Sequence, residues 1–315
     1  MPSVAVVLGA GGIVGGAFHA GVLTALAEAG FDARCADLLV GTSAGSGVAA
    51  VLRAGFPPLD LAARNTGRPL SRDAAAIVGR AKGPPVFDFR PRPFSRPPVP
   101  ASPRLLLHAG RHPAKALAGL LPQGTISTDA IGERIGAIYS GRIWPEERLW
   151  ICAVDLDRGD RVVFGRDELS TPVGIAVQAS SSIPGFFRPV QHEGRRYVDG
   201  GVHSPTNADL LRNSRADLVV VVSPMSAARA GRRSSRVGTR ALHSAQLSRE
   251  VRRLEDVGLA VLTIEPTSSD LVAMGRNPMD ARRGEVTTNS ALASTRKRLA
   301  DPSLADHLQV LRSVS

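Results

Sequence analysis

One pentapeptide constrains this chain most: Gly41–Gly45 has the sequence Gly-Thr-Ser-Ala-Gly and lies between an apolar run and a small-residue helical pattern. The run at 37–40 has the length of a buried strand, and the pattern at 46–54 has helical spacing. A strand, a sharp turn and a helix are therefore predicted, with the Ser43 hydroxyl exposed above a sheet. Small-residue turns are also common without catalysis, so Ser43 still needs a base, an oxyanion site and a substrate.

The bulk composition allows a large buried core. With 315 residues, of which 43% are hydrophobic, the chain suits one large α/β domain or two smaller ones. No apolar run reaches the roughly 18 residues of a membrane span, and the first residues lack the basic start of a secretory signal. Cys35 and Cys152 are too few for a disulfide framework. We therefore expect a cytoplasmic protein.

The net charge of +11 comes almost entirely from arginine, because the lysines are only Lys82, Lys115 and Lys297. Such a surface favours anionic partners, either phospholipid or nucleic acid. Aromatic residues make up only 4% of the chain, and no nucleic-acid motif is present, so no nucleic-acid partner is expected. A solvated basic surface and peripheral contact with an anionic membrane are the remaining alternatives.

Apolar runs of strand length alternate with helical patterns along most of the chain. The expected strands are 4–8, 38–40, 149–156, 161–164, 218–222 and 260–264, and the expected helices include 18–29, 59–65, 128–139, 173–181, 241–257 and 291–299. This alternation predicts an α/β fold in which helices cover both faces of a central sheet.

The composition changes within residues 83–121, where prolines and arginines dominate up to about 113 and a short helix is expected after 105. A long stretch of this kind within a compact domain is usually functional or unstructured. We interpret it as a lid or cap insertion at about 83–121, with an unstructured insertion as the alternative. The remaining sequence is expected to form a single domain over 1–315, with a polar C-terminal extension after about 270.

A glycine-rich stretch, Gly9–Gly16, follows the first strand and permits two interpretations. A dinucleotide-binding fold would need an acidic residue at the end of the second strand, but Ser43 occupies that place. Alternatively, the backbone N–H groups of the glycine turn stabilise a developing oxyanion, aided by the positive end of the following helix. Both glycine motifs follow strands, at the edge where α/β sheets place their sites.

Ser43 needs a base within hydrogen-bond reach. None of the seven histidines lies in a recognisable motif, and His203 is the best placed because it follows an acidic turn. That turn, Asp199-Gly200-Gly201, puts a carboxylate at the end of a short strand. Asp-Gly is also the commonest sequence of ordinary turns, so the motif by itself leaves the role of Asp199 open.

Together and in this order, the motifs resemble the patatin-like phospholipase family over roughly residues 4–222. The matching segments are Gly11-Gly12-x-x-Gly15, Gly21-Val22-Leu23, Gly41-Thr42-Ser43-Ala44-Gly45, Ala179–Phe187, Asp199-Gly200-Gly201 and Asn207-Ala208-Asp209. The resemblance implies a patatin-like three-layer sandwich with a mostly parallel central sheet. It also implies that one catalytic domain carries all these motifs.

The resemblance further implies a Ser–Asp dyad without a histidine. Ser43 would be the nucleophile, and Asp199 the base that also activates the water that hydrolyses the acyl-enzyme. The implied oxyanion donors are the backbone N–H groups of Gly11, Gly12, Ile13 and Ala44. The expected activity is a lipolytic serine hydrolase that cleaves acyl esters of phospholipids or related lipids. Its partner is a lipid or acyl-ester substrate, and neither a metal nor a cofactor is expected.

Two positions depart from the family pattern. Val14 stands where many relatives carry Arg or Lys before the last glycine of the first loop, and Ala10 stands at the opening glycine position. These departures leave the substrate preference open, as well as transacylation in place of hydrolysis. Two other functions stay open at this point: a lipid- or acyl-binding module without turnover, and a dinucleotide-binding protein.

Overall fold

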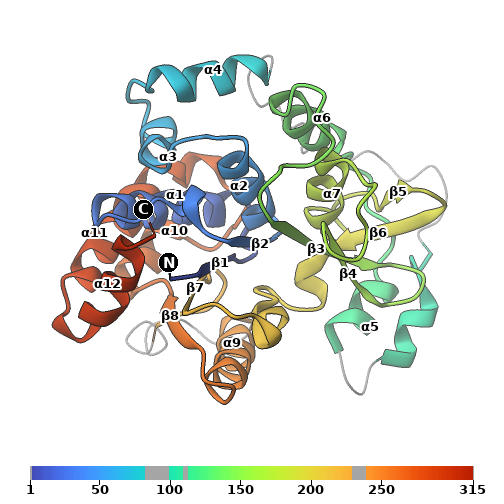
Figure 1. The fold of residues 1–315 in the computed structure, drawn as a ribbon. Coiled ribbons are helices and arrows are strands. Elements are labelled where there is room, and N and C mark those ends of the chain that lie inside the picture. The colour runs from blue at the N-terminus through green and yellow to red at the C-terminus, as the bar shows by residue number, and fades with distance from the viewer. Residues whose placement is uncertain (1, 82–98, 109–112, 229–238, 315) are drawn as a thin grey trace.

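Among the residues that the computed structural model describes (2–81, 99–108, 113–228 and 239–314), eight strands form one sheet (Figure 1). Their order is β5-β6-β3-β2-β1-β7-β8, and β4 pairs with β3 outside this path. The strands are β1 Val4–Leu8, β2 Leu38–Thr42, β3 Leu149–Asp155, β4 Arg161–Phe164, β5 Val190–His192, β6 Arg195–Asp199, β7 Leu218–Val222 and β8 Ala260–Ile264. The central five are parallel, whereas β4, β5 and β6 pair antiparallel.

Helices cover both faces of this sheet, with α1 and α2 on one side and α9 on the other (Figure 1). The helices are α1 Gly12–Glu28, α2 Ala44–Arg53, α3 Pro58–Asn65, α4 Arg72–Arg80, α5 Pro113–Leu120, α6 Asp129–Ile138, α7 Val173–Ser180, α9 Thr239–Glu255, α10 Ser268–Met274, α11 Gly284–Leu299 and α12 Ala305–Arg312. Short 3₁₀ helices are η1 Ala33–Cys35, η2 Pro103–His108, η3 Gly200–Val202, η4 Ala208–Asn213, η5 Ala281–Arg283 and η6 Pro302–Leu304. The predicted three-layer α/β fold with a mostly parallel sheet is confirmed.

The apolar strands are buried on both faces because successive side chains of a strand point to opposite sides. Leu8 and Leu39 belong to the core that includes α1 and α2. Val7 and Val40 belong to the opposite core, where Leu247 of α9 packs. This double burial explains why the parallel strands are continuous hydrophobic runs in the sequence.

Helix α1 begins at Gly12, so the prediction that the glycine loop continues to Gly16 was wrong. The glycines at the start of α1 allow close packing and do not form an irregular loop. A Cβ atom on Gly11 would lie 2.9 Å from Cβ of Pro224, and one on Gly15 would lie 3.3 Å from the same atom. Gly11 and Gly15 therefore lie too close to Pro224 for a larger side chain.

Helix α11 lies along α1 and is longer than the predicted helix at 291–299, since it begins at Gly284. A Cβ atom on Gly21 of α1 would lie only 2.4 Å from the carbonyl oxygen of Thr288, so the two helices are in backbone contact. Leu292 of α11 belongs to the same buried core as β1. Residues after about 270 thus contribute to the main core.

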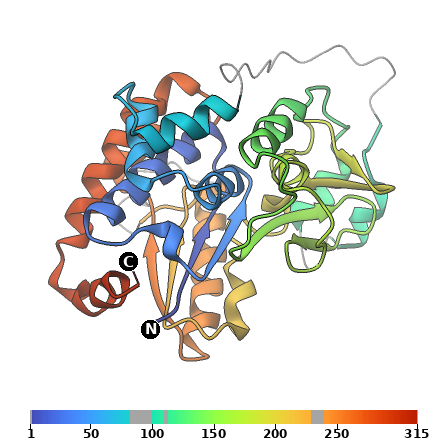
Figure 2. The same cartoon turned by 45° about the horizontal axis from the view of Figure 1, so that its top comes forward.

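Part of the predicted lid or cap at 83–121 lies outside the described residues, namely 83–98 and 109–112. The described part forms η2 and α5, which lie beside the antiparallel strands (Figure 2). Leu105 and Ala118 pack there against Val154 of β3 and Val198 of β6. This segment therefore covers the antiparallel part of the sheet.

Candidate active site

Ser43 lies on a strained turn between β2 and α2. Its φ of 54° falls in the left-handed region, which a residue with a Cβ rarely adopts. The turn is fixed from both sides, because the Ser43 N–H donates to Oγ of Ser180 at 2.9 Å and the Ser43 carbonyl accepts from Oγ of Ser46 at 2.6 Å. The predicted strand–turn–helix is therefore present, and its geometry is that of a serine elbow.

The glycines of the elbow are required by space. A Cβ atom on Gly45 would lie 2.0 Å from the carbonyl oxygen of Leu8, and one on Gly41 would lie 2.5 Å from Cα of Ser46. Gly45 thus brings the elbow against the end of β1, where the glycine-rich turn begins. The two motifs are far apart in sequence but adjacent in the fold.

Gly45→Ala is expected to lower the free energy of unfolding by about 3 kcal/mol or more, because the new methyl group meets backbone that cannot move aside. Chemical unfolding in urea measures the change. Gly136→Ala in α6 is the matched control: nothing lies within 4 Å of its added Cβ atom, and alanine there should stabilise the helix by up to about 1 kcal/mol. Equal midpoints for Gly45→Ala and the wild type would refute the packing argument.

Asp199 ends β6 and faces Ser43. Its carboxylate accepts hydrogen bonds from the Ser43 hydroxyl and from the Gly201 N–H, the latter at 2.7 Å. The Asp199 N–H donates to the carbonyl of Ser182 at 3.0 Å, which fixes the end of the strand. The following Gly200 has no room for a side chain, since a Cβ atom would lie 2.3 Å from the Cys152 carbonyl oxygen.

Burial raises the pKa of Asp199 to about 6, although the hydrogen bonds from Ser43 and Gly201 act in the opposite direction. The side chain is buried, with 5% of its residue surface exposed, and its charge therefore lacks water. A carboxylate with this pKa is ionised at neutral pH and is a stronger proton acceptor than an ordinary aspartate.

Among the histidines whose side chains the structure describes, none is a comparable partner of Ser43, whose hydroxyl bonds to Asp199. His203 caps η3, the turn that follows Asp199. His19 is fully buried under the glycine-rich turn, where its Nε2–H donates to the Gly9 carbonyl at 2.7 Å. Burial lowers the pKa of His19 to about 4, so its ring is neutral and supports the turn.

The glycine-rich turn presents free backbone donors beside Ser43. Ala10 N–H donates to the Pro205 carbonyl at 2.8 Å and Val14 N–H to the Pro278 carbonyl at 3.0 Å, which anchors the turn at both ends. Within the described residues, no protein acceptor takes the N–H groups of Gly11, Gly12, Ile13 and Ala44. Gly11 is the N-cap of α1, and the other three donors lie in the first turns of α1 and α2, where the helix dipole favours negative charge.

A buried carboxylate on α9 supports the turn from behind. Glu250 accepts hydrogen bonds from the hydroxyls of Ser204 and Thr206 and from the Ala208 N–H. These contacts fix the segment whose Pro205 carbonyl holds Ala10. Asn207, with a left-handed φ of 54°, donates from Nδ2 to the Thr42 hydroxyl at 3.1 Å. Residues 207–209 and Ser180 lie in segments that carry the family resemblance but had no predicted role, and Glu250 lies in none of these segments.

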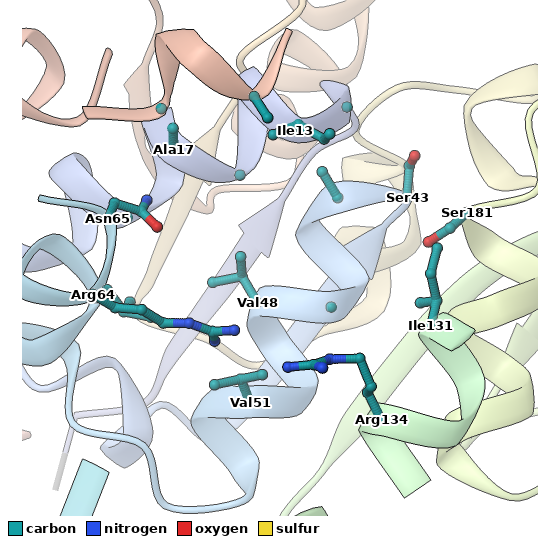
Figure 3. Close-up of a pocket in the computed structure, with 18 of the residues that line it drawn as sticks. Ile13, Ala17, Ser43, Val48, Val51, Arg64, Asn65, Ile131, Arg134 and Ser181 are labelled. Carbon is teal, nitrogen blue, oxygen red and sulfur yellow. The ribbon is translucent and has the colours of Figure 1, made fainter. Parts of the chain in front are cut away.

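Ser43 opens into a pocket of about 1080 Å³ (Figure 3). One stripe of α2 forms part of its wall, since Ala44, Val48 and Val51 follow helical spacing away from Ser43. Further lining residues are Gly12, Ile13, Ile131, Ile135, Val177 and Phe187. The described part of the predicted lid, 99–108 and 113–121, does not line this pocket. A mostly apolar cavity of this size suits an acyl chain.

Within the described ranges, no helix combines the length and the apolar character of a membrane span. In the same part of the chain, no group of three or more His, Cys, Asp or Glu side chains is arranged to hold a metal ion.

The fold and the Ser43 turn define an α/β protein with a serine elbow at the carboxyl end of a parallel strand. The family model described as patatin-like phospholipase matches residues 6–212, and the chain belongs to that family. The resemblance seen in the sequence is thereby confirmed.

The chain is also similar in sequence to several individual proteins. Uncharacterized NTE family proteins of Mycobacterium bovis and of two Mycobacterium tuberculosis strains are each 28% identical over 226 residues, which cover 70% of this chain and 49% of theirs. The chain thus spans about half the length of the curated relatives it matches. Among solved structures, VipD from Legionella pneumophila aligns with a TM-score of 0.43 and 15% identity, covering 99% of this chain and 67% of its own.

Proposed function

We propose that this protein is a lipolytic serine hydrolase that cleaves acyl ester bonds of phospholipids or related lipids with a Ser43–Asp199 dyad. Membership of the patatin-like phospholipase family supports lipid acyl hydrolase activity in general. The observation that carries the finer proposal is the hydrogen bond from the strained Ser43, which lines a mostly apolar pocket, to the buried Asp199 carboxylate.

In the proposed reaction, Asp199 takes the proton of the Ser43 hydroxyl as Oγ attacks the ester carbonyl carbon. The resulting oxyanion accepts hydrogen bonds from the unpaired N–H groups at the starts of α1 and α2. Collapse breaks the bond to the alcohol, which leaves with the proton from Asp199. A water molecule then loses a proton to Asp199 and attacks the acyl-enzyme, which releases the acid and restores Ser43.

Hydrolysis of 4-nitrophenyl butyrate, together with labelling of Ser43 by a fluorophosphonate probe, tests the proposal directly. We expect both with the purified wild-type chain, because an activated serine reacts with either reagent. Mass spectrometry of the labelled peptide identifies the modified residue. Folded protein that neither hydrolyses the ester nor reacts at Ser43 would instead support a binding module without turnover.

The activity is expected to depend on pH through Asp199. Since the base must be ionised, kcat/KM should fall tenfold for each pH unit below a midpoint of about 6. Above this midpoint it should reach a plateau. The measurement is kcat/KM for 4-nitrophenyl butyrate between pH 4.5 and 8.5, with circular dichroism to verify folding at each pH. Glu250→Gln should keep the same midpoint, because Glu250 does not touch Ser43. A midpoint that moves with Glu250→Gln would exclude Asp199 as its origin.

A further inference from the structure

An apolar path leads from Ser43 along the pocket. Its walls include small or aliphatic residues of α1 and α2, namely Gly16, Ala17, Gly47, Val48 and Val51. In Figure 3, Val48 and Val51 lie progressively farther from Ser43 along α2. A linear apolar group that begins at Ser43 can therefore follow this path and lose its contact with water.

The position of Asp199 decides which part of an ester follows the apolar path. Ser43 lines the pocket, as do Gly12, Ile13 and Ala44, which carry proposed oxyanion donors. Asp199 does not line it, although its carboxylate accepts a hydrogen bond from Ser43. In the proposed reaction the alcohol oxygen takes its proton from Asp199, so the alcohol part lies on the Asp199 side of Ser43. The acyl chain, on the other side of the carbonyl carbon, extends into the pocket.

Two glycines keep the apolar path open close to Ser43. Gly47 lies one helical turn beyond Ser43 in α2, and Gly16 lies one turn beyond Gly12 in α1. Among the described residues, a Cβ atom on Gly16 would have nothing within 4 Å, and one on Gly47 would lie 3.9 Å from Cγ1 of Val177. Glycine is unfavourable inside a helix, and packing does not require it at these two positions. The space that both glycines leave belongs to the pocket.

The length of the apolar path follows from α2. A helix rises about 1.5 Å per residue, so Gly47 lies about 6 Å and Val51 about 12 Å beyond Ser43. Near Val51 the pocket also contains charged groups, because Arg64 of α3 and Arg134 of α6 point towards this valine in Figure 3. An extended chain advances about 1.2 Å per bond, so about ten carbons reach from Ser43 to Val51.

We infer that the substrates are esters of medium-length acyl chains, of about ten carbons, and that Gly16 and Gly47 determine this preference; this rests on the proposed function. The acyl chain passes the two glycines and ends near Val51. Each methylene group buried on the way raises kcat/KM by about fourfold. A side chain at either glycine would obstruct the chain beyond about its fifth carbon.

Two isomeric esters test the direction of the chain. Ethyl decanoate carries its ten-carbon chain on the acyl side, whereas decyl acetate carries it on the alcohol side. Titration of the released acid measures the hydrolysis of both. We expect kcat/KM to be at least tenfold higher for ethyl decanoate, because only its chain is buried along the apolar path. Equal values, or faster hydrolysis of decyl acetate, would overturn the assignment of the path to the acyl chain.

A series of 4-nitrophenyl esters measures the length preference. In the wild type, kcat/KM should rise at least 100-fold from butyrate to decanoate and less than tenfold from decanoate to tetradecanoate. In Gly47→Leu and in Gly16→Leu, the ratio of decanoate to butyrate should fall at least tenfold, because butyrate ends before the new side chain. This ratio compares two esters on one protein, so a general loss of activity does not change it.

Gly136→Leu in α6 is the matched control. Its added Cβ atom also has nothing within 4 Å, but Gly136 does not line the pocket, so the wild-type ratio should be kept. A wild-type ratio near one would overturn the inference. So would a wild-type ratio in both Gly47→Leu and Gly16→Leu, once circular dichroism has shown them to be folded. A further 100-fold rise to tetradecanoate would overturn the length limit at Val51.

Binding to Ser43→Ala separates failure of the apolar path from failure of the hydrolase. By calorimetry, decanoate should bind at least tenfold more tightly than hexanoate, and adding Gly47→Leu should remove the difference. If no ester is hydrolysed but this length-dependent binding is present, the proposed function fails and the path stands. If esters of all lengths are hydrolysed equally and the two acids bind equally, the hydrolase stands and the path fails.

Discussion

Ser43→Ala should lower kcat for ester hydrolysis by about 10⁴-fold or more and abolish fluorophosphonate labelling. The loss is expected to be this large because the nucleophile and its base act as a unit, and what is left comes from binding and the oxyanion donors alone. The fold should be kept, since Ser43 is anchored through its backbone N–H and carbonyl groups to Ser180 and Ser46. Steady-state assays with 4-nitrophenyl butyrate measure the change in kcat.

A serine outside the site provides the comparison. Ser248→Ala on α9 removes a hydroxyl that donates to the Ser244 carbonyl on the same helix, and it should keep both labelling and turnover. A Ser43→Ala protein that is folded and still turns over the ester at a tenth of the wild-type rate would rule out Ser43 as nucleophile.

Asp199→Asn should reduce kcat by about 10³-fold or more, because an amide cannot take the proton of Ser43 or of water. The amide oxygen can still accept the hydrogen bonds from Ser43 and the Gly201 N–H, so the geometry of the turn should be retained. The assay is kcat at pH 8, where the wild-type carboxylate is ionised. If Asp199→Asn keeps most of the activity, another group must be the base.

The same substitution should leave the protein equally stable or more stable at pH 8. Burial raises the pKa of Asp199 from its ordinary 3.8 to about 6, so the folded state holds its proton more tightly than the unfolded state. Stability contributed by the protonated form is present below pH 3.8 and is lost as the pH rises to about 6. The charge therefore costs on the order of 3 kcal/mol at pH 8, which asparagine avoids. Urea unfolding of both proteins at pH 8 measures the difference.

Local patterns were enough to predict the parallel strands of the sheet and the turn at Ser43. The apolar runs at 4–8 and 218–222 became β1 and β7 without change, because strands buried on both faces must be continuously hydrophobic. The turn at Ser43 was predictable because its steric demands are met within a few residues. The role of Asp199 emerged only from the ordered set of motifs, since Asp-Gly turns are common.

Contacts between distant segments were not predictable in this way. Ser180 holds the Ser43 N–H, and Glu250 holds the segment behind the glycine-rich turn, yet neither lies in a motif with that function. Arg64 and Arg134 line the same pocket although they belong to different helices, α3 and α6. The small residues of α1 were interpreted as a loop because their true partner, Pro224, lies far along the chain.

The position of β7 in the sheet determines how much of the chain is needed to complete the fold. The family match stops at residue 212, but β1 pairs on one side with β7, which begins at Leu218. A chain that ended at 212 would leave β1 as an open edge with unpaired backbone groups, and it would uncover the α1 surface that α11 buries. We therefore expect that the segment that carries every site motif does not fold by itself. The part without recognisable motifs completes the sheet beside β1 and buries α1.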